Sequence, residues 1–228
     1  MSMKRSVFAS LVVCGFAVGA AQGAVITLRS GDTTGAAGTP DPNVTVLPGP
    51  AGTGFTSLTP TDFTDAQITP AVIAPPNGFW IFTLPADPDA RWITTGIGGT
   101  DEPSGLYAIH FFNPGFPEAN LDLFYMVDDY LGAVSGSTVL TASVYLNGEP
   151  LTATNGDIAG TGDFLQQHEL QFVDMPLLPG ENWLYLNVTN TIGLSGVIFS
   201  GTLTLVPEPA SLSLLGIGAL GLLQRRKR

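Results

Sequence analysis

Apolar and polar residues alternate along several short segments in the second half of the chain. Within residues 183–188 the even-numbered positions are aliphatic, whereas the odd-numbered positions are Trp, Tyr and Asn. Residues 140–146 follow the same rule, with Thr, Ser and Tyr at the odd-numbered positions. A period of two places one parity on each face of a β-strand. We therefore predict two strands here, with Leu186 facing the core and Tyr185 on a face that tolerates aspartate.

Further strands are predicted on both sides of these two. Residues 121–127 carry apolar side chains on both faces, which is typical of a central strand. Residues 25–28 predict a short first strand, and alternate apolar residues within 197–205 share one face of the last strand. Gly201 is expected to form a β-bulge in that strand. Asn147-Gly148 predicts a turn, because this pair suits positive φ at both positions.

The first part of the chain has a different composition. Residues 30–78 are rich in Gly, Pro, Thr and Asp, show no helical period and contain only brief apolar runs such as residues 44–47. We expect loops and short strands there, wrapped over the sheet. The whole chain has 28 Gly and 18 Pro among 228 residues, and 44% of its residues are hydrophobic. This composition favours an all-β fold with a proper core, namely one β-sandwich domain over residues 24–205.

The first 23 residues are predicted to be a signal peptide. Two basic residues precede an apolar run over residues 7–21 that is too short to span a bilayer permanently. Ala21 and Gly23 supply the small side chains that a signal peptidase requires just before a cleavage site at Ala24. Cleavage one residue later is the alternative. A buried N-terminal helix would lack the basic flank and the small residues, so we expect export.

Residues 206–228 are predicted to form a second targeting segment. The segment begins with Val206-Pro207-Glu208-Pro209 and continues with an apolar stretch over residues 210–223. It ends, after Gln224, with the four cations Arg225, Arg226, Lys227 and Arg228. As a helix the apolar stretch would cover roughly 21 Å, short of the ~30 Å hydrocarbon core. The terminal cations are expected to stay in the cytoplasm as a stop-transfer signal, which leaves residues 24–206 outside.

This C-terminal segment resembles the PEP-CTERM tag of Gram-negative exopolysaccharide producers, because Pro-Glu-Pro, a short apolar helix and an Arg-rich cluster follow in order. The resemblance implies that an exosortase, a membrane cysteine protease, recognises Pro-Glu-Pro and removes the helix. It implies a transient membrane anchor, followed by residence at the cell surface, in the outer envelope or in the extracellular matrix. An ordinary tail anchor is the alternative. The motif has also been labelled a C-terminal domain of ice-binding proteins, which does not indicate that this protein binds ice.

The body resembles a galactose-binding-like jelly roll, a fold found in many PEP-CTERM proteins. The matching segments are residues 91–93, 121–129, 144–148, 178–184, 187–190 and 195–196, with Asp41-Pro42-Asn43 and Trp80 as further matches. The resemblance implies a jelly-roll β-sandwich flanked by the N-terminal signal helix and the C-terminal apolar helix. It implies a carbohydrate-binding ancestry and supplies no binding site.

Charge and cysteine content exclude several functions. Between residues 24 and 206, Arg29 and Arg91 stand against 18 acidic residues, which gives this part a net charge of −16. Such a body repels phosphate backbones, so nucleic acid is excluded as a partner. The sole cysteine, Cys14, lies in the predicted signal peptide. The mature domain is therefore expected to lack disulfides, thiolate metal sites and cysteine nucleophiles.

Few residues are candidates for metal binding or catalysis. Asp128 and Asp129 follow a predicted strand directly and are candidate calcium ligands. The alternative is that one points to solvent and the other caps a turn; Asp87 and Asp89 are a weaker pair. His110 lies in an apolar run and His168 in a polar one, and neither accompanies a Gly-x-Ser-x-Gly or His-Glu-x-x-His motif. We therefore expect a protein without catalytic activity and without a cofactor other than a candidate calcium ion.

A sugar site needs an aromatic ring that stacks on a pyranose and polar groups that bind the hydroxyls. Trp183, opposite the aliphatic face of its strand, is the candidate; its alternative role is to pack under a loop. Trp92 matches a structural position of the jelly-roll family and is assigned to the core. The expected function is that of an exported surface or matrix protein associated with exopolysaccharide and biofilm, with polysaccharide as a candidate partner. A secreted glycan-active enzyme and an adhesion or ice-binding protein are the alternatives.

Overall fold

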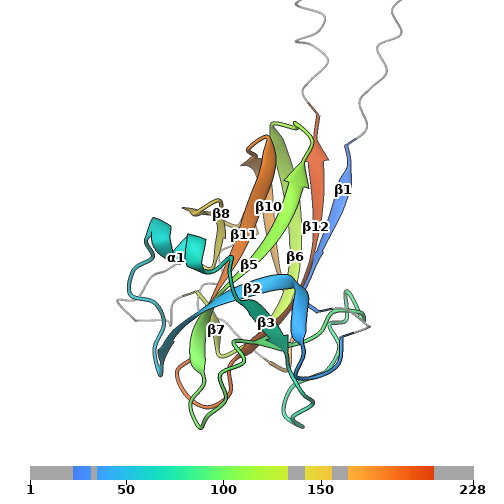
Figure 1. Ribbon diagram of the computed structural model, residues 1–228. Coiled ribbons are helices and arrows are strands. Elements are labelled where there is room, and N and C mark those ends of the chain that lie inside the picture. The colour runs from blue at the N-terminus through green and yellow to red at the C-terminus, as the bar shows by residue number, and fades with distance from the viewer. Residues whose placement is uncertain (1–22, 32–34, 133–141, 156–163, 208–228) are drawn as a thin grey trace, which may run out of the picture. The chain divides into compact units, whose positions relative to one another are not determined.

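A computed structural model describes residues 23–31, 35–132, 142–155 and 164–207. These residues belong to one compact unit, Gly23–Pro207. They form twelve strands and one short helix (Figure 1). The strands are β1 (Val25–Arg29), β2 (Pro40–Ala51), β3 (Pro70–Ile73), β4 (Ile93–Thr94), β5 (Pro103–Asn113), β6 (Glu118–Asp128), β7 (Tyr130–Leu131), β8 (Val144–Leu146), β9 (Glu149–Pro150), β10 (His168–Pro176), β11 (Gly180–Thr189) and β12 (Gly196–Val206); the helix is α1 (Pro60–Asp65).

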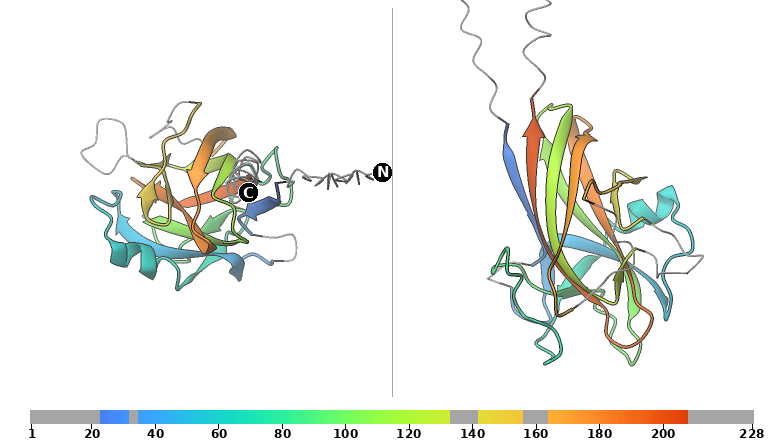
Figure 2. Two further views of the ribbon diagram at one scale, coloured as in Figure 1. Left: turned by 90° about the horizontal axis from the view of Figure 1, so that it is seen from above. Right: turned by 180° about the vertical axis from the view of Figure 1, so that it is seen from behind.

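The strands form a single antiparallel sheet that curls on itself. Its order is β10-β6-β12-β4-β3-β2-β5-β11-β8-β9, with β1 also pairing with β12 and β7 with β11. The long strands β6 and β12 face β5 and β11 across the interior, and the short β3 and β4 join these two halves at one end (Figures 1 and 2). The predicted all-β class is confirmed, and the curled sheet is compatible with a jelly roll.

The main core lies between the two halves. β6 runs between β10 and β12 and contributes Leu121, Leu123, Tyr125 and Val127 to it, as predicted for a central strand. The expected bulge at Gly201 is wrong, because β12 pairs with β6 in one unbroken register from Gly196 to Val206. Gly201 instead makes room for its neighbour: a Cβ there would lie 3.0 Å from Leu121 Cδ1. The Asn147-Gly148 turn is confirmed, with φ of 53° and 90°.

A second cluster covers the outer face of the β5–β11 half. Phe63 of α1 packs on Tyr145 and Tyr185, with ring centroids 5.2 Å and 4.9 Å apart. The prediction of two opposite faces on β11 is confirmed, but the expectation that Tyr185 tolerates aspartate is wrong, because Tyr185 is buried under α1. Helix α1 itself was not expected. It begins at a capping box in which Thr59 and Asp62 bind each other's backbone amides.

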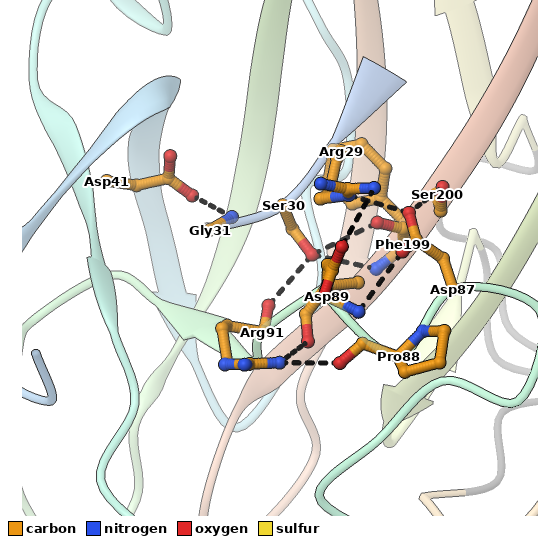
Figure 3. A network of polar contacts seen from close by, with 11 residues as sticks. Arg29, Ser30, Gly31, Asp41, Asp87, Pro88, Asp89, Arg91, Phe199 and Ser200 are labelled. Atoms are coloured by element: carbon orange, nitrogen blue, oxygen red, sulfur yellow. Dashed lines mark hydrogen bonds and ion pairs between the residues drawn. The ribbon is translucent and has the colours of Figure 1, made fainter. Parts of the chain in front are cut away.

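A third cluster covers the outer face of β6 and β12. Trp80 and Trp92 stack there with ring centroids 4.3 Å apart, so the assignment of Trp92 to a buried cluster is confirmed. The loop that carries them is held to the sheet by Asp87, whose Oδ2 accepts hydrogen bonds from Arg29 Nε and Ser200 Oγ, both at 2.6 Å (Figure 3). Asp87 and Asp89 therefore serve an ion-pair network around Arg29.

Within the described ranges, no helix has the length and hydrophobicity needed to cross a bilayer. The predicted signal peptide up to residue 22 and the predicted C-terminal helix lie outside those ranges.

Candidate functional site

The outer face of the β5–β11 half is only partly covered by α1. The covered part includes Ala108 and Tyr185. Further along the same face, Trp183 pairs with His110, and Glu181 pairs with Phe112. Phe112 is 58% exposed, and Trp183 is half-buried at the margin of the covered cluster. Three rings and a carboxylate thus lie on adjacent strands of a rigid sheet.

Three of these four residues contact one another or a neighbouring turn. The rings of Trp183 and His110 have centroids 5.0 Å apart and are inclined at 54°. His110 Nε2 contacts the carboxylate of Glu181. The backbone amide of Trp183 donates to Asn147 Oδ1 at 2.9 Å, so the turn after β8 fixes the position of Trp183 in β11. The contact with His110 restricts the Trp183 ring before a ligand binds, which favours affinity.

A cleft of about 1160 Å³ opens beside these rings. One wall is the aromatic group of Trp183, His110 and Phe112, with Glu181. Strands β1 and β2 also line the cleft. These two strands contribute Thr27, Arg29, Asn43 and Thr45 to the lining. The cleft therefore combines aromatic rings with amide, hydroxyl and guanidinium groups.

This combination contains both kinds of group that contact a sugar. Aromatic faces contact the C–H surface of a pyranose, while polar side chains bind its hydroxyl groups. Glycoside hydrolysis generally needs two carboxyl groups on opposite sides of the glycosidic bond. Among the described residues that line the cleft, Glu181 supplies the one carboxylate.

The sequence-based candidates lie in different places. Trp183 lies in the cleft, but its companions Phe112 and Glu181 were missed. His110 lies on the outer face of β5 with its side chain 40% exposed. His168 lies on β10, away from the cleft lining, with its ring 5.5 Å from that of Tyr125. A prediction of the cleft would have required the register between β5 and β11, which no local pattern contains.

Asp128 and Asp129 lie outside the cleft, at the end of β6. Trp80 Nε1 donates to Asp128 Oδ2 at 2.6 Å. The pKa of Asp128 is raised to about 6, mainly by burial and further by the carboxyl groups of Asp129 and Glu102, whereas the hydrogen bond from Trp80 opposes this shift. Asp129 Oδ2 accepts hydrogen bonds from the backbone amide and the hydroxyl of Thr191. Asp128 thus bonds to Trp80 and Asp129 to Thr191, and the two carboxyl groups also hydrogen-bond to each other. Asp129 fixes the loop after β11.

The C-terminal end of the body leads into the predicted sorting segment. Leu205 is buried in β12, Val206 ends that strand, and Pro207 is the last described residue before the tail. Residues 205–228 match the PEP-CTERM protein-sorting motif. The protein is therefore an exported chain that carries the signal for exosortase recognition and cell-surface anchoring. Glu208, Pro209 and the terminal cations belong to the matched segment, although they lie outside the described residues. No curated protein sequence matches the chain.

Proposed function

We propose that this exported protein is a non-catalytic carbohydrate-binding protein of the bacterial surface or extracellular matrix. Its body is a galactose-binding-like jelly roll, and its ligand is a polysaccharide of the matrix or biofilm of a Gram-negative cell. Exosortase sorting delivers the body, and the cleft beside Trp183 binds the glycan. The observation that carries this proposal is the grouping of Trp183, His110, Phe112 and Glu181 beside a cleft of about 1160 Å³.

The net charge of the body indicates which class of polysaccharide it binds. The body between residues 24 and 206 has a net charge of −16. Arg29, the cation of the cleft lining, already forms an ion pair with Asp87 at 2.6 Å. An anionic chain would therefore meet general repulsion without an unpaired cation to offset it. The expected ligands are neutral hexose polymers, and their binding should depend little on salt.

Glycan binding by the secreted protein tests this proposal. A glycan array followed by calorimetry on the best neutral oligosaccharide should give a saturable signal. Trp183→Ala should weaken binding about tenfold or more, because a lost aromatic contact of ~1.4 kcal/mol corresponds to a factor of ten. Phe112→Ala should also weaken binding, and since Phe112 is 58% exposed, its loss should leave the fold unaffected.

A matched control is Phe79→Ala, because Phe79 is 69% exposed and lies outside the cleft lining. The affinity of the Phe79→Ala variant for the oligosaccharide should equal that of the wild type. Absence of binding to every neutral glycan, or equal affinity of the Trp183 and Phe79 variants, would refute the proposal. Release of reducing ends during incubation would instead identify a glycan-active enzyme.

A further inference from the structure

A second cleft, of about 440 Å³, adjoins the cleft of about 1160 Å³ beside Trp183, which we call the first cleft. Trp183 and Glu181 of β11 line both clefts. In the first cleft they are accompanied by residues of β1, β2 and β5. In the second cleft they are accompanied by residues of α1 and of the turn between β8 and β9. The two clefts therefore meet at the same two residues of β11.

The order of the strands places Trp183 between the two clefts. β11 pairs with β5 on one side and with β8 on the other. Trp183 pairs with His110 of β5, and its carbonyl oxygen accepts a hydrogen bond from the backbone amide of Asn147 at 2.9 Å. His110 lines the first cleft and Asn147 lines the second. A ligand that crosses β11 at Trp183 would thus pass from one cleft into the other.

The second cleft contains the same kinds of group as the first. Its lining includes the ring of Phe63 and the aliphatic side chain of Leu178, which is 55% exposed. Thr64 adds a hydroxyl and Gln67 an amide. Gln67 Nε2 donates to the Tyr185 hydroxyl at 2.6 Å, which uses one of the four hydrogen-bonding positions of the amide. Apolar surface and polar side chains are thus available to the C–H faces and the hydroxyl groups of a sugar.

The turn beside the second cleft contacts both β11 and α1. Asn147 Nδ2 donates to Asn182 Oδ1, and Asn147 Oδ1 accepts from the amide of Trp183, both at 2.9 Å. A Cβ at Gly148 would lie 3.4 Å from Phe63 Cδ2, so the turn also lies close to α1 (Figures 1 and 2). These contacts restrict the turn before a ligand binds, which favours affinity.

The charges of the second cleft agree with those of the first. Among the described residues that line the second cleft, the charged ones are Glu149 and Glu181, and both are acidic. In the first cleft, Arg29 is already paired with Asp87. An anionic ligand would meet repulsion in both clefts, so one neutral ligand can occupy them together.

We propose that the two clefts form one extended groove, which binds several consecutive residues of a neutral polysaccharide chain that crosses β11 at Trp183. This inference rests on the proposed glycan-binding function and adds that the ligand is a chain segment rather than a single sugar. The first cleft, about 1160 Å³, already exceeds the ~300–1,000 Å³ of a pocket for one small ligand, and the second extends it. Binding in one cleft raises the effective concentration of the chain at the other, so affinity increases with chain length.

The dependence of affinity on oligosaccharide length tests this groove. Calorimetry on the secreted protein uses three series of two to six residues: cello-oligosaccharides, manno-oligosaccharides and galacto-oligosaccharides. In a series that binds, the hexasaccharide should bind about tenfold or more tightly than the disaccharide, because its second contact is intramolecular. Leu178→Ala should weaken hexasaccharide binding about threefold or more, since loss of even one buried methylene has roughly this effect. The same variant should keep the wild-type affinity for the disaccharide, because Leu178 lines the second cleft and lies outside the lining of the first.

Thr64→Trp is a second variant that tests the groove by blocking it. Thr64 is exposed on α1 and lines the second cleft, so a tryptophan there should remove the gain from chain length without unfolding the domain. The matched control is Leu165→Ala, because Leu165 is 54% exposed, as Leu178 is 55%, and lies outside both linings. It should bind every oligosaccharide like the wild type.

The outcomes separate this inference from the function on which it rests. Equal affinity for the disaccharide and the hexasaccharide would overturn the extended groove and leave the glycan site beside Trp183 intact. A gain from chain length that is undiminished in both Leu178→Ala and Thr64→Trp would do the same. Absence of binding in all three series would instead contradict the proposed binding of neutral hexose polymers, and the extended groove would fail with it.

Discussion

Tyr185 and Leu186 are neighbours in β11 that point to opposite faces of the sheet, and both are buried. Leu186 belongs to the main core, whereas Tyr185 lies in the cluster beneath α1 and accepts a hydrogen bond from Gln67 Nε2 at 2.6 Å. Leu186→Asp and Tyr185→Asp should therefore each cost several kcal/mol of unfolding free energy. Tyr185→Phe should cost only about 1 kcal/mol, the typical value of one hydrogen bond.

Urea unfolding of the three variants checks this prediction. If Tyr185→Asp is as stable as the wild type, α1 does not cover the outer face as described. Near-equal loss in the two aspartate variants is the expected result. That result would show that both faces of β11 are buried. The sequence reveals the alternation of the two faces, but the burial of the second face depends on α1, whose residues lie more than a hundred positions away in the chain.

Asp87 links stability to pH. Burial alone would raise the pKa of Asp87, but the hydrogen bonds from Ser200 and Arg29 outweigh it and hold the pKa below its usual range. A depressed folded-state pKa stabilises the protein above the unfolded-state value of about 4 and loses this contribution as the pH falls through the folded-state value. Asp87→Asn should be less stable at pH 7 and should lose less stability than the wild type on acidification.

Melting curves between pH 7 and pH 3 measure this difference. Asp65→Asn is a suitable control, because Asp65 is an exposed residue of α1. Parallel loss of stability in the wild type and in Asp87→Asn would mean that the Arg29–Asp87–Ser200 network contributes nothing at neutral pH.

At the scale of elements, β1 is the strand that joins the start of the body to its end. Leu205 donates its amide to the Ala24 carbonyl at 2.8 Å, and Val25 pairs with Thr204. Hydrogen-bonded and non-hydrogen-bonded pairs alternate in an antiparallel ladder, so Val25 and Thr204 form a non-hydrogen-bonded pair with closely spaced Cα atoms. That spacing suits a disulfide.

The variant with Val25→Cys and Thr204→Cys should therefore oxidise spontaneously and gain about 2–5 kcal/mol in unfolding free energy, since the bridge closes a very long loop. The sole native cysteine, Cys14, lies in the predicted signal peptide and would not compete. Reduction with dithiothreitol should remove the gain. Free thiols after air oxidation would show that β1 does not pair with β12 in this register.

The sequence predicted those strands and turns that depend on a pattern of a few neighbouring residues. Alternation was sufficient for residues 183–188, apolar side chains on both faces were sufficient for residues 121–127, and the Asn147-Gly148 pair was sufficient for its turn. Helix α1 was missed because six residues are too few for a period, although Thr59 and Asp62 form a capping box. The cleft was missed for a different reason. Trp183, Phe112 and Glu181 meet through pairing between strands about seventy residues apart, and this register depends on the whole sheet.

At the scale of the whole molecule, the two ends of the body lie side by side. Position 23 comes so close to β12 that a Cβ there would lie 2.3 Å from the Leu205 carbonyl oxygen, so glycine fits both this contact and the predicted cleavage site. Intact mass of the secreted protein should show the loss of about 23 N-terminal residues and of the segment after Pro209. A full-length C-terminus in a host that has an exosortase would contradict the expected processing.

The terminal cations should decide whether the chain stops in the membrane. The apolar stretch of residues 210–223 is short for a bilayer, and Gly216, Gly218 and Gly221 lower its helix propensity. Retention of the segment in the membrane therefore depends on the four terminal cations, because moving four charges through hydrocarbon is costly. These cations are Arg225, Arg226, Lys227 and Arg228. Without exosortase, the wild type should stay in the membrane fraction, whereas a variant with Ser or Gln at all four positions should leak into the medium. A matched control replaces Gln224 by Ser and keeps the charges, so it should be retained like the wild type. Equal retention of all three proteins would show that contacts of the apolar segment, rather than the cations, hold the precursor in place.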